Sequence, residues 1–254
     1  MNIISVRKEK ERLEKENAEI GMYIQKDKQK LERWRENRVR IERMNDSINA
    51  AENLAKSLMD DSQIGKRFRS RTFETWDKSK FQSAYDFCYK YANEFDKNNG
   101  DGIILMGGAG TGKTHLASAI ANYLMHESLV PVKFGTFANL LDKMKLAFHT
   151  DKDVVNQLSN VSMLIIDDLG KEKYTEWAQQ VLFQVIDNRY NNELPLIITT
   201  NLRPEELRER FGEPIVSRLM EMCYGIAMNG DNYRYEKAIQ NRRPSSAEST
   251  AAAY

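Results

Sequence analysis

Residues 107–114 read Gly-Gly-Ala-Gly-Thr-Gly-Lys-Thr and match the G-x-x-x-x-G-K-[ST] pattern of a phosphate-binding loop. Glycines let backbone N–H groups approach a phosphate closely, Lys113 can reach the β- and γ-phosphates, and Thr114 can ligate Mg²⁺. An apolar run at 102–106 precedes the loop and a helical pattern follows it, which favours a nucleotide site over a simple glycine-rich turn. We therefore predict an ATP and Mg²⁺ site formed by Gly107, Gly108, Ala109, Gly110, Thr111, Gly112, Lys113, Thr114 and His115.

A second group of polar residues follows two further apolar runs. Residues 163–168 read Met-Leu-Ile-Ile-Asp-Asp, a buried strand that ends in two carboxylates. We predict that Asp167 helps to hold Mg²⁺ and that Asp168 polarises the attacking water. Asn201 follows the run at 196–200, where its amide can orient that water. Acidic residues also occur at ordinary strand ends. We assign Asp167 and Asp168 to the nucleotide site because a phosphate loop precedes them in the sequence.

The pattern beyond residue 100 alternates short apolar runs with amphipathic segments. The runs predict strands at 103–106, 132–137, 162–166, 196–200 and 224–228. The amphipathic segments predict helices at 113–126, 137–148, 152–159, 175–190 and 204–211. Such alternation is typical of an α/β fold in which helices flank a parallel sheet.

The first 60 residues have a different pattern, with no proline, one glycine and an apolar stripe at helical spacing between charged flanks. Such a helix could pack on its own domain, but we favour an arm that docks on a partner, because a long amphipathic segment needs a surface to cover. Gly21 leaves open whether the arm is one helix or a hairpin. The predicted domains are an arm at 1–64, a nucleotide-binding domain at 65–238 and a flexible tail at 239–254.

Composition excludes several classes of protein. The chain has 38 Lys and Arg against 37 Asp and Glu, so any contact with nucleic acid must come from a local patch. No apolar run approaches the ~20 residues of a membrane span, and the charged N-terminus does not resemble an export signal. The two cysteines, Cys88 and Cys223, lie in apolar surroundings and predict buried thiols. We therefore expect a cytoplasmic protein without a membrane partner.

The order of these motifs resembles the AAA+ ATPases, and more closely the DnaC/DnaI-type bacterial helicase loaders and the related IstB transposition ATPases. The resemblance covers residues 65–236 and rests on Arg67-Phe68-Arg69, Thr72-Phe73-Glu74, Gly110-Thr111-Gly112-Lys113-Thr114-His115-Leu116-Ala117, Leu164-Ile165-Ile166-Asp167-Asp168-Leu169-Gly170, Thr199-Thr200-Asn201, Ser217-Arg218-Leu219 and Asn232-Tyr233-Arg234. It implies an AAA+ P-loop fold with a minimal lid and an N-terminal arm. It also implies that Asn201 is sensor 1, Arg234 takes the sensor 2 role and Arg218 is an arginine finger. Such a finger acts on a neighbouring subunit, so the resemblance implies self-association on ATP.

The segment between the second and third predicted strands resembles the insertion helix of these loaders. Lys143 and Lys145 supply charge for a DNA backbone and Phe148 a ring for base stacking, which predicts a site for single-stranded DNA. The other interpretation is a helix that buries Leu140, Leu141, Met144 and Phe148 in its own core.

Two features depart from the family pattern. Asp168 stands where many AAA+ proteins have Glu, and its shorter side chain predicts slow hydrolysis. The arm lacks the Cys/His cluster of loaders with a zinc-binding front domain. The resemblance implies an ATPase that loads a replicative hexameric helicase in a bacterial or phage-infected cell, and we expect residues 1–64 to bind that helicase. An IstB-like transposition helper and a non-hydrolysing, ATP-switched adaptor are the alternatives.

Overall fold

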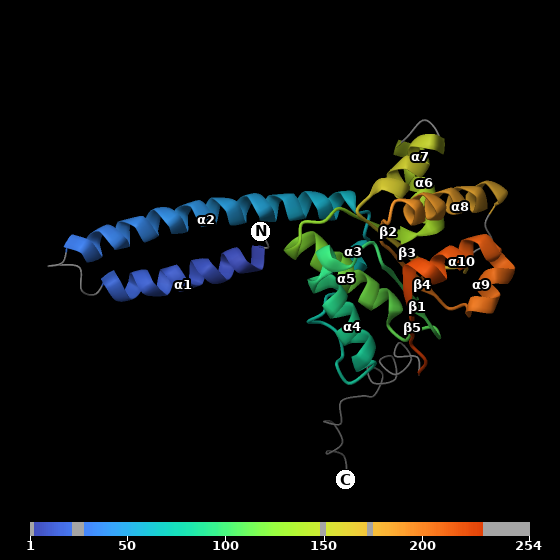
Figure 1. Cartoon of the computed structure of the whole chain (residues 1–254), viewed down its shortest axis with the longest axis horizontal. Coiled ribbons are helices and arrows are strands. Elements are labelled where there is room, and N and C mark those ends of the chain that lie inside the picture. The colour runs from blue at the N-terminus through green and yellow to red at the C-terminus, as the bar shows by residue number, and fades with distance from the viewer. Residues whose placement is uncertain (1–2, 22–27, 148–150, 172–174, 231–254) are drawn as a thin grey trace, which may run out of the picture.

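The chain consists of a long helical arm and an α/β domain (Figure 1). The computed structural model describes residues 3–21, 28–147, 151–171 and 175–230. Within those ranges, no helix is both long and apolar enough to cross a bilayer.

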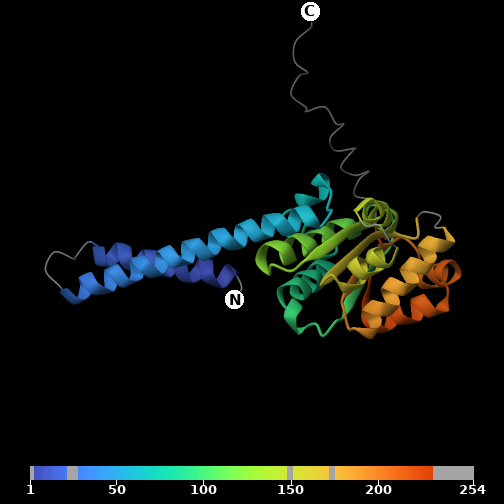
Figure 2. The same cartoon turned by 90° about the horizontal axis from the view of Figure 1, so that it is seen from above.

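The arm is a hairpin of two antiparallel helices, α1 (Ile3–Gly21) and α2 (Lys28–Asp61), that lie side by side in both views (Figures 1 and 2). Leu13 is buried between them, and Arg40 reaches across to Glu9 with an N–O distance of 2.9 Å. The first helix ends at Gly21, so the amphipathic stripe folds back on itself instead of continuing as one helix.

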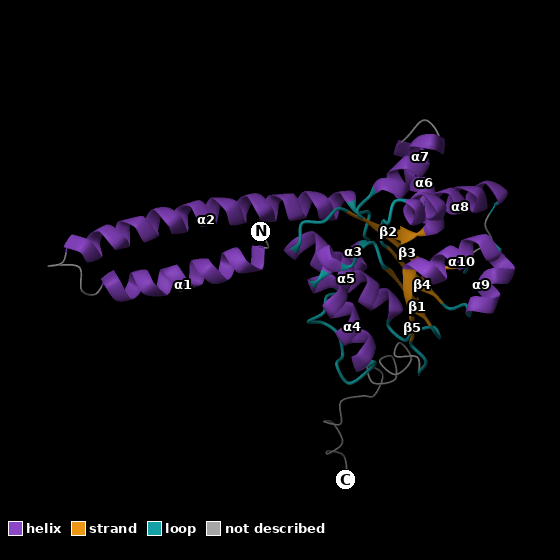
Figure 3. Cartoon of the chain, viewed as in Figure 1, coloured by secondary structure: helices purple, strands orange, loops and turns teal. Residues whose placement is uncertain are grey.

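The domain is built on a five-stranded sheet in the order β2-β3-β4-β1-β5, and every neighbouring pair is parallel (Figure 3). The strands are β1 (Gly102–Met106), β2 (Val132–Thr136), β3 (Met163–Leu169), β4 (Leu196–Thr200) and β5 (Cys223–Ala227). The predicted α/β fold with a parallel sheet is confirmed. Strand β3 runs three residues beyond its predicted end and includes both aspartates of the acidic motif.

Helices cover both faces of the sheet. They are α3 (Lys66–Arg69), α4 (Gln82–Asn93), the short 3₁₀ helix η2 (Phe95–Lys97), α5 (Lys113–Glu127), α6 (Phe137–Ala147), α7 (Asp151–Asn160), α8 (Glu176–Asn191), α9 (Pro204–Phe211) and α10 (Glu213–Met222). The five predicted helical segments do not include α10, whose second residue is Pro214. A proline fits the first turn of a helix, where its missing N–H has no partner to lose.

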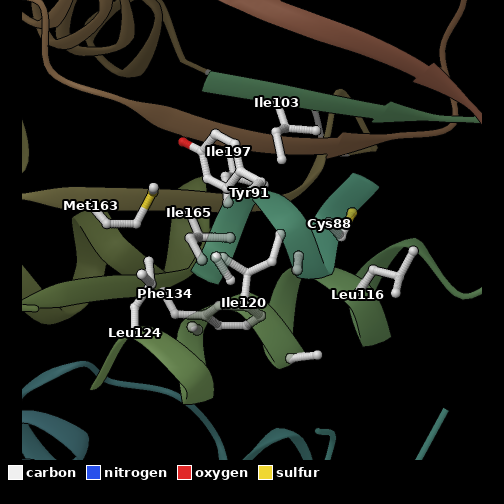
Figure 4. Close-up of a cluster of buried hydrophobic side chains, with 14 of the residues drawn as sticks. Cys88, Tyr91, Ile103, Leu116, Ile120, Leu124, Phe134, Met163, Ile165 and Ile197 are labelled. Atoms are coloured by element: carbon white, nitrogen blue, oxygen red, sulfur yellow. The ribbon is translucent and has the colours of Figure 1, made fainter. Parts of the chain in front are cut away.

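Side chains of alternate strand residues enter two separate cores. Ile103 and Leu105 point to the face covered by α4 and α5, a cluster that Figure 4 shows in part. Ile104 points to the opposite face, among side chains of α6, α7, α8, α9 and α10. Cys88 is a free, fully buried thiol of the first core, where burial raises its pKa to about 12, and Cys223 is free and partly buried. The sheet is therefore the middle of three layers.

The arm is joined to the sheet at the edge strand β2. Lys133 is 7% exposed, and its Nζ donates to the carbonyl oxygen of Asp61 at 3.0 Å and to the carboxylate of Asp61 at 2.8 Å. The backbone N–H of Phe134 donates to the carbonyl oxygen of Ser62 at 2.9 Å. The end of α2 is thereby tied to the sheet that carries the nucleotide motifs.

Candidate functional site

The phosphate-loop motif connects the end of β1 to the start of α5, as its sequence context indicated. Two of its glycines cannot be replaced without moving their neighbours. Gly107 has φ +144°, and a Cβ there would lie 2.2 Å from the carbonyl oxygen of Met228. Gly112 has φ +102°, and a Cβ there would lie 2.5 Å from the ring of Trp76. Packing against residues distant in the sequence therefore fixes the shape of the loop.

Lys113 lies folded over this loop. Its Nζ donates to the carbonyl oxygens of Gly107 at 2.8 Å and Gly108 at 2.6 Å, and only 6% of the residue is exposed. The hydroxyl of Thr111 also donates to Gly108, at 3.0 Å. The ammonium group is thus held inside the loop, at the position from which it can be drawn to an incoming phosphate.

Asp167 is 7% exposed at the end of β3, and its Oδ1 accepts a 2.6 Å hydrogen bond from the Thr199 hydroxyl. Burial raises the pKa of the Asp167 carboxyl above its usual range, and hydrogen bonds from Thr199 and Thr114 and the charge of Lys113 act in the opposite direction. The helix start and the acidic strand therefore meet. A carboxylate and a hydroxyl suit Mg²⁺, which prefers oxygen ligands, so Asp167 and Thr114 fit the predicted metal.

Asp168 has an unusual backbone. Its φ is +57°, and the pairing of β3 with β4 shifts register between Ile166 and Leu169 around it. A non-glycine residue in this region costs about 1–3 kcal/mol and persists only where its surroundings hold it. Here the backbone N–H of Asp168 donates to the Thr199 hydroxyl at 2.8 Å. The two adjacent carboxylates therefore have different partners, Thr199 for Asp167 and Asn201 for Asp168.

The Asp168 carboxylate lies beside Asn201, whose Nδ2 donates to its Oδ1 at 3.3 Å. The other oxygen, Oδ2, is 3.0 Å from Nζ of Lys171. The structure thus brings together the two residues assigned to the attacking water. The hydroxyl of Thr199 contacts both aspartates. This role was not predicted, because Thr-Thr before a polar residue is ordinary at a strand end.

His115 faces the segment that precedes β1. Its Nε2 is 3.0 Å from the carbonyl oxygen of Thr72 and 3.3 Å from the hydroxyl of Thr75, and its ring meets the edge of Trp76 with centroids 5.2 Å apart. Burial lowers the pKa of the imidazole, so the ring is neutral near pH 7. With the ring engaged here, we expect any contribution of His115 to nucleotide binding to come from its backbone.

Arg218 lies far from the phosphate loop of its own chain. It is on α10, one turn before β5 begins, whereas the loop, Asp168 and Asn201 are at the ends of β1, β3 and β4. Its guanidinium pairs with Asp187, near the end of α8 that precedes β4, so Arg218 lies toward the ends at which the parallel strands begin. This placement agrees with the predicted action of Arg218 on a neighbouring subunit.

The predicted DNA-binding residues are only partly within the described structure. Lys143 and Lys145 belong to α6, but their side chains are outside the described part, as are Phe148 and Arg234 altogether. Leu140 and Leu141 of the same helix are 1% and 3% exposed. The first half of α6 therefore packs into the domain core, as the second interpretation of this segment expected.

These features define an ATP-binding AAA+ domain: a parallel sheet in the order β2-β3-β4-β1-β5 with a phosphate loop after β1 and an acidic motif in β3. Residues 69–241 match the family described as IstB-like ATP binding protein, and the chain belongs to this family.

Several known proteins are similar in sequence. The phage-like element PBSX protein XkdC of Bacillus subtilis (strain 168) is 30% identical over 207 residues, which cover 76% of this chain and 77% of that protein. The replicative helicase loader DnaC of Escherichia coli (strain K12) is 32% identical over 150 residues, or 57% of this chain and 60% of that protein.

Solved structures agree on the fold. The crystal structure of the DnaC helicase loader matches with a TM-score of 0.59 and 26% identity, over 65% of this chain and 99% of that one. The replication initiator DnaA bound to AMPPCP and single-stranded DNA matches with a TM-score of 0.56 and 20% identity, over 72% of this chain and 58% of that one, which shows the fold alone. The arm lies outside the family match, so its partner cannot be taken from the family.

Proposed function

We propose that this protein is an ATP-dependent helicase loader that acts when DNA replication starts. One observation carries the proposal: an IstB-like ATP site is joined, through Lys133 and Asp61, to a projecting helical arm with an apolar groove. Similarity to proteins named replicative helicase loaders supports it. In this proposal, residues 1–64 bind the replicative hexameric helicase and the 65–238 domain binds and hydrolyses ATP.

The site residues divide the chemistry between them. Lys113 exchanges the loop carbonyls for the β- and γ-phosphates, which are stronger acceptors. Thr114 and Asp167 hold Mg²⁺, which when bound offsets phosphate charge. Asp168 accepts a proton from the attacking water while Asn201 orients that water. Asp168 is one methylene shorter than Glu, so we expect slow turnover.

The groove on the arm supports docking on a protein. Its volume is about 700 Å³, and charged side chains of Glu9, Arg40 and Arg43 border its apolar lining. The apolar residues that line it are Ile3, Val6, Met44, Ile48, Ala50, Ala51, Leu54 and Leu129. An amphipathic helix of a partner would place its apolar face in such a groove and its polar face against the border. We propose that the helicase supplies this helix.

Single-stranded DNA is the second proposed ligand. Lys143, Lys145 and Phe148 give each subunit a short basic contact with one stacking ring, which binds weakly alone. When ATP brings subunits side by side, several such contacts follow one strand and avidity increases the affinity. The salt-sensitive part should come from the lysines and the salt-insensitive part from Phe148.

The second candidate function is an IstB-like transposition helper, and the family match over residues 69–241 favours it. That function requires binding to duplex DNA and a transposase as partner. A helicase loader should instead prefer single-stranded DNA and bind a hexameric helicase. The two functions therefore differ in both the DNA and the protein partner.

The test uses the full chain with a purified replicative hexameric helicase or a transposase, each with Mg-ATP. Two exposed apolar residues of α2 give a matched pair: Leu54 lines the groove at 46% exposure, and Val39 lies outside it at 48%. Leu54→Glu should weaken helicase binding about ten-fold or more, the size of an interface hot spot, and Val39→Glu should not. Equal binding by both variants would exclude the groove, and binding to the transposase alone would favour the second candidate.

A further inference from the structure

The guanidinium of Arg218 is held within its own subunit. Its Nη2 forms an ion pair with Oδ1 of Asp187 at 2.8 Å, and its Nη1 donates to the carbonyl oxygen of Pro214 at 2.8 Å. The Arg218 and Asp187 side chains are 29% and 31% exposed. Helices α8 and α10, which carry them, pack side by side (Figure 1). Both terminal nitrogens of the proposed arginine finger thus have a partner in the free subunit.

The surface that holds Arg218 is one face of α8. The guanidinium carbon lies 5.5 Å from the ring centroid of Phe183 and 5.8 Å from that of Tyr190. These residues and Asp187 are spaced by four and three positions, so they share a helical face. The amide of Asn191 donates to the second oxygen of Asp187 at 3.2 Å and fixes the carboxylate. A carboxylate and two ring faces therefore surround one cation.

The contact between Arg218 and Asp187 can break at a small cost in free energy. An ion pair between partly exposed side chains contributes little, because water solvates both charges when they separate. A phosphate offers Arg a shorter, charge-assisted and often bidentate contact. The Nε of Arg218 is buried and, within the described structure, has no hydrogen-bond partner. The present contacts therefore leave one nitrogen of the guanidinium without an acceptor. A γ-phosphate at a subunit contact can therefore compete with Asp187.

We propose that Asp187 is a positioning residue that holds Arg218 against α8 in the free subunit and releases it to the γ-phosphate of ATP bound by a second copy of this chain. This proposal rests on the proposed action of Arg218 in trans. Breaking the Asp187 contact opposes assembly, and only a neighbour that carries a γ-phosphate offsets that cost. The γ-phosphate, which ADP lacks, is therefore what draws Arg218 away from Asp187.

The test measures assembly by sedimentation velocity against protein concentration, with Mg-ATP, a non-hydrolysable ATP analogue or Mg-ADP. Asp187→Asn keeps the shape of the side chain and removes its charge. It should lower the concentration for half-maximal assembly in ATP by about two- to five-fold, because a partly exposed ion pair no longer has to break. Asp187→Glu should restore behaviour close to wild type. Glu213→Gln, which breaks the 3.1 Å ion pair between α10 and Arg208 of α9, is the matched control and should not change assembly.

A double variant shows whether the effect passes through Arg218. Asp187→Asn combined with Arg218→Ala should assemble like Arg218→Ala alone, and nucleotide affinity of the free subunit should stay unchanged in every variant. Assembly of Asp187→Asn at the same or a higher concentration than wild type would overturn the proposal. If wild type and Arg218→Ala assemble equally in ATP, the proposed trans action fails and the role of Asp187 fails with it.

Discussion

Thr199 holds Asp167 by a 2.6 Å hydrogen bond from its hydroxyl to the Oδ1 carboxylate oxygen, at the end of neighbouring strands. The same hydroxyl accepts the backbone N–H of Asp168 at 2.8 Å. One threonine therefore positions the proposed metal ligand and also stabilises the left-handed backbone of Asp168, the residue proposed to act on the attacking water. This relationship couples the two halves of the proposed hydrolytic site.

Thr199→Val should lower the rate of ATP hydrolysis about ten-fold or more, because the Asp167 carboxylate loses a hydrogen-bond donor and the backbone N–H of Asp168 loses its acceptor. ATP binding through the phosphate loop should change little. Thr200→Val is the matched control, since the buried Thr200 hydroxyl donates to the backbone carbonyl of Leu169 at 2.7 Å and contacts neither aspartate. Each variant should lose about 1–3 kcal/mol of stability. Equal loss of hydrolysis in both would show that the effect is only structural.

Asp167→Asn should change how stability depends on pH. Burial raises the folded-state pKa of Asp167 above its unfolded value, so the folded state favours the protonated form. The resulting penalty is absent below the unfolded pKa and grows as the pH rises through the folded pKa. Relative to wild type, the nucleotide-free variant should therefore gain unfolding free energy as the pH rises above about 4, the ordinary pKa of an aspartate. Chemical denaturation at several pH values measures this difference, and a variant that loses stability relative to wild type as pH rises contradicts the account.

Asp168→Asn should retain Mg-ATP and stop hydrolysis, because the carboxylate acts on water and not on the nucleotide. The amide can keep the contact with Asn201 at 3.3 Å, so the fold should be preserved. Nucleotide binding by fluorescence and single-turnover hydrolysis measure the two steps separately. If Mg-ATP affinity falls instead, Asp168 is the metal ligand and the roles of the two aspartates are reversed.

Lys133→Ala should loosen the attachment of the arm. The buried ammonium holds the end of α2 through two acceptors on Asp61, and hydrogen bonds to charged groups contribute about 1.5–3 kcal/mol. Hydrogen exchange in the last turn of α2 should become faster. Lys10→Ala is the control, since Lys10 pairs with Glu14 on the arm surface at 3.7 Å and should contribute little. Unchanged exchange in Lys133→Ala would mean that the backbone contact of Ser62 is sufficient.

Much of the domain could be predicted because its strands are buried and its loops have strong signals. The bounds of β4 at 196–200 were predicted correctly, since a central strand of a parallel sheet is apolar on both faces. The end of β3 was not, because Asp167 and Asp168 look like turn residues until Thr199 supplies their hydrogen bonds. The contact of Arg218 with Asp187 joins two helices far apart in sequence, and no local spacing indicates it.

The hairpin of the arm also could not be predicted from local sequence alone. The apolar stripe predicted helices, but the fold at Gly21 depends on whether two halves of the stripe pack better on each other than on a partner. Leu13 is 2% exposed, so part of the stripe is buried within the hairpin itself. Another part of the stripe, Met44, Ile48 and Ala51, lines the groove that we propose for the helicase.

The most direct test of the loader function measures how much replicative hexameric helicase is retained on closed circular single-stranded DNA. Wild-type protein with ATP should increase retention above that of helicase alone, and Lys113→Ala should not, because the loop then lacks its phosphate-binding charge. If wild type and Lys113→Ala retain equal amounts of helicase, or if wild type retains no more than helicase alone while binding duplex DNA tightly, the protein is not a helicase loader.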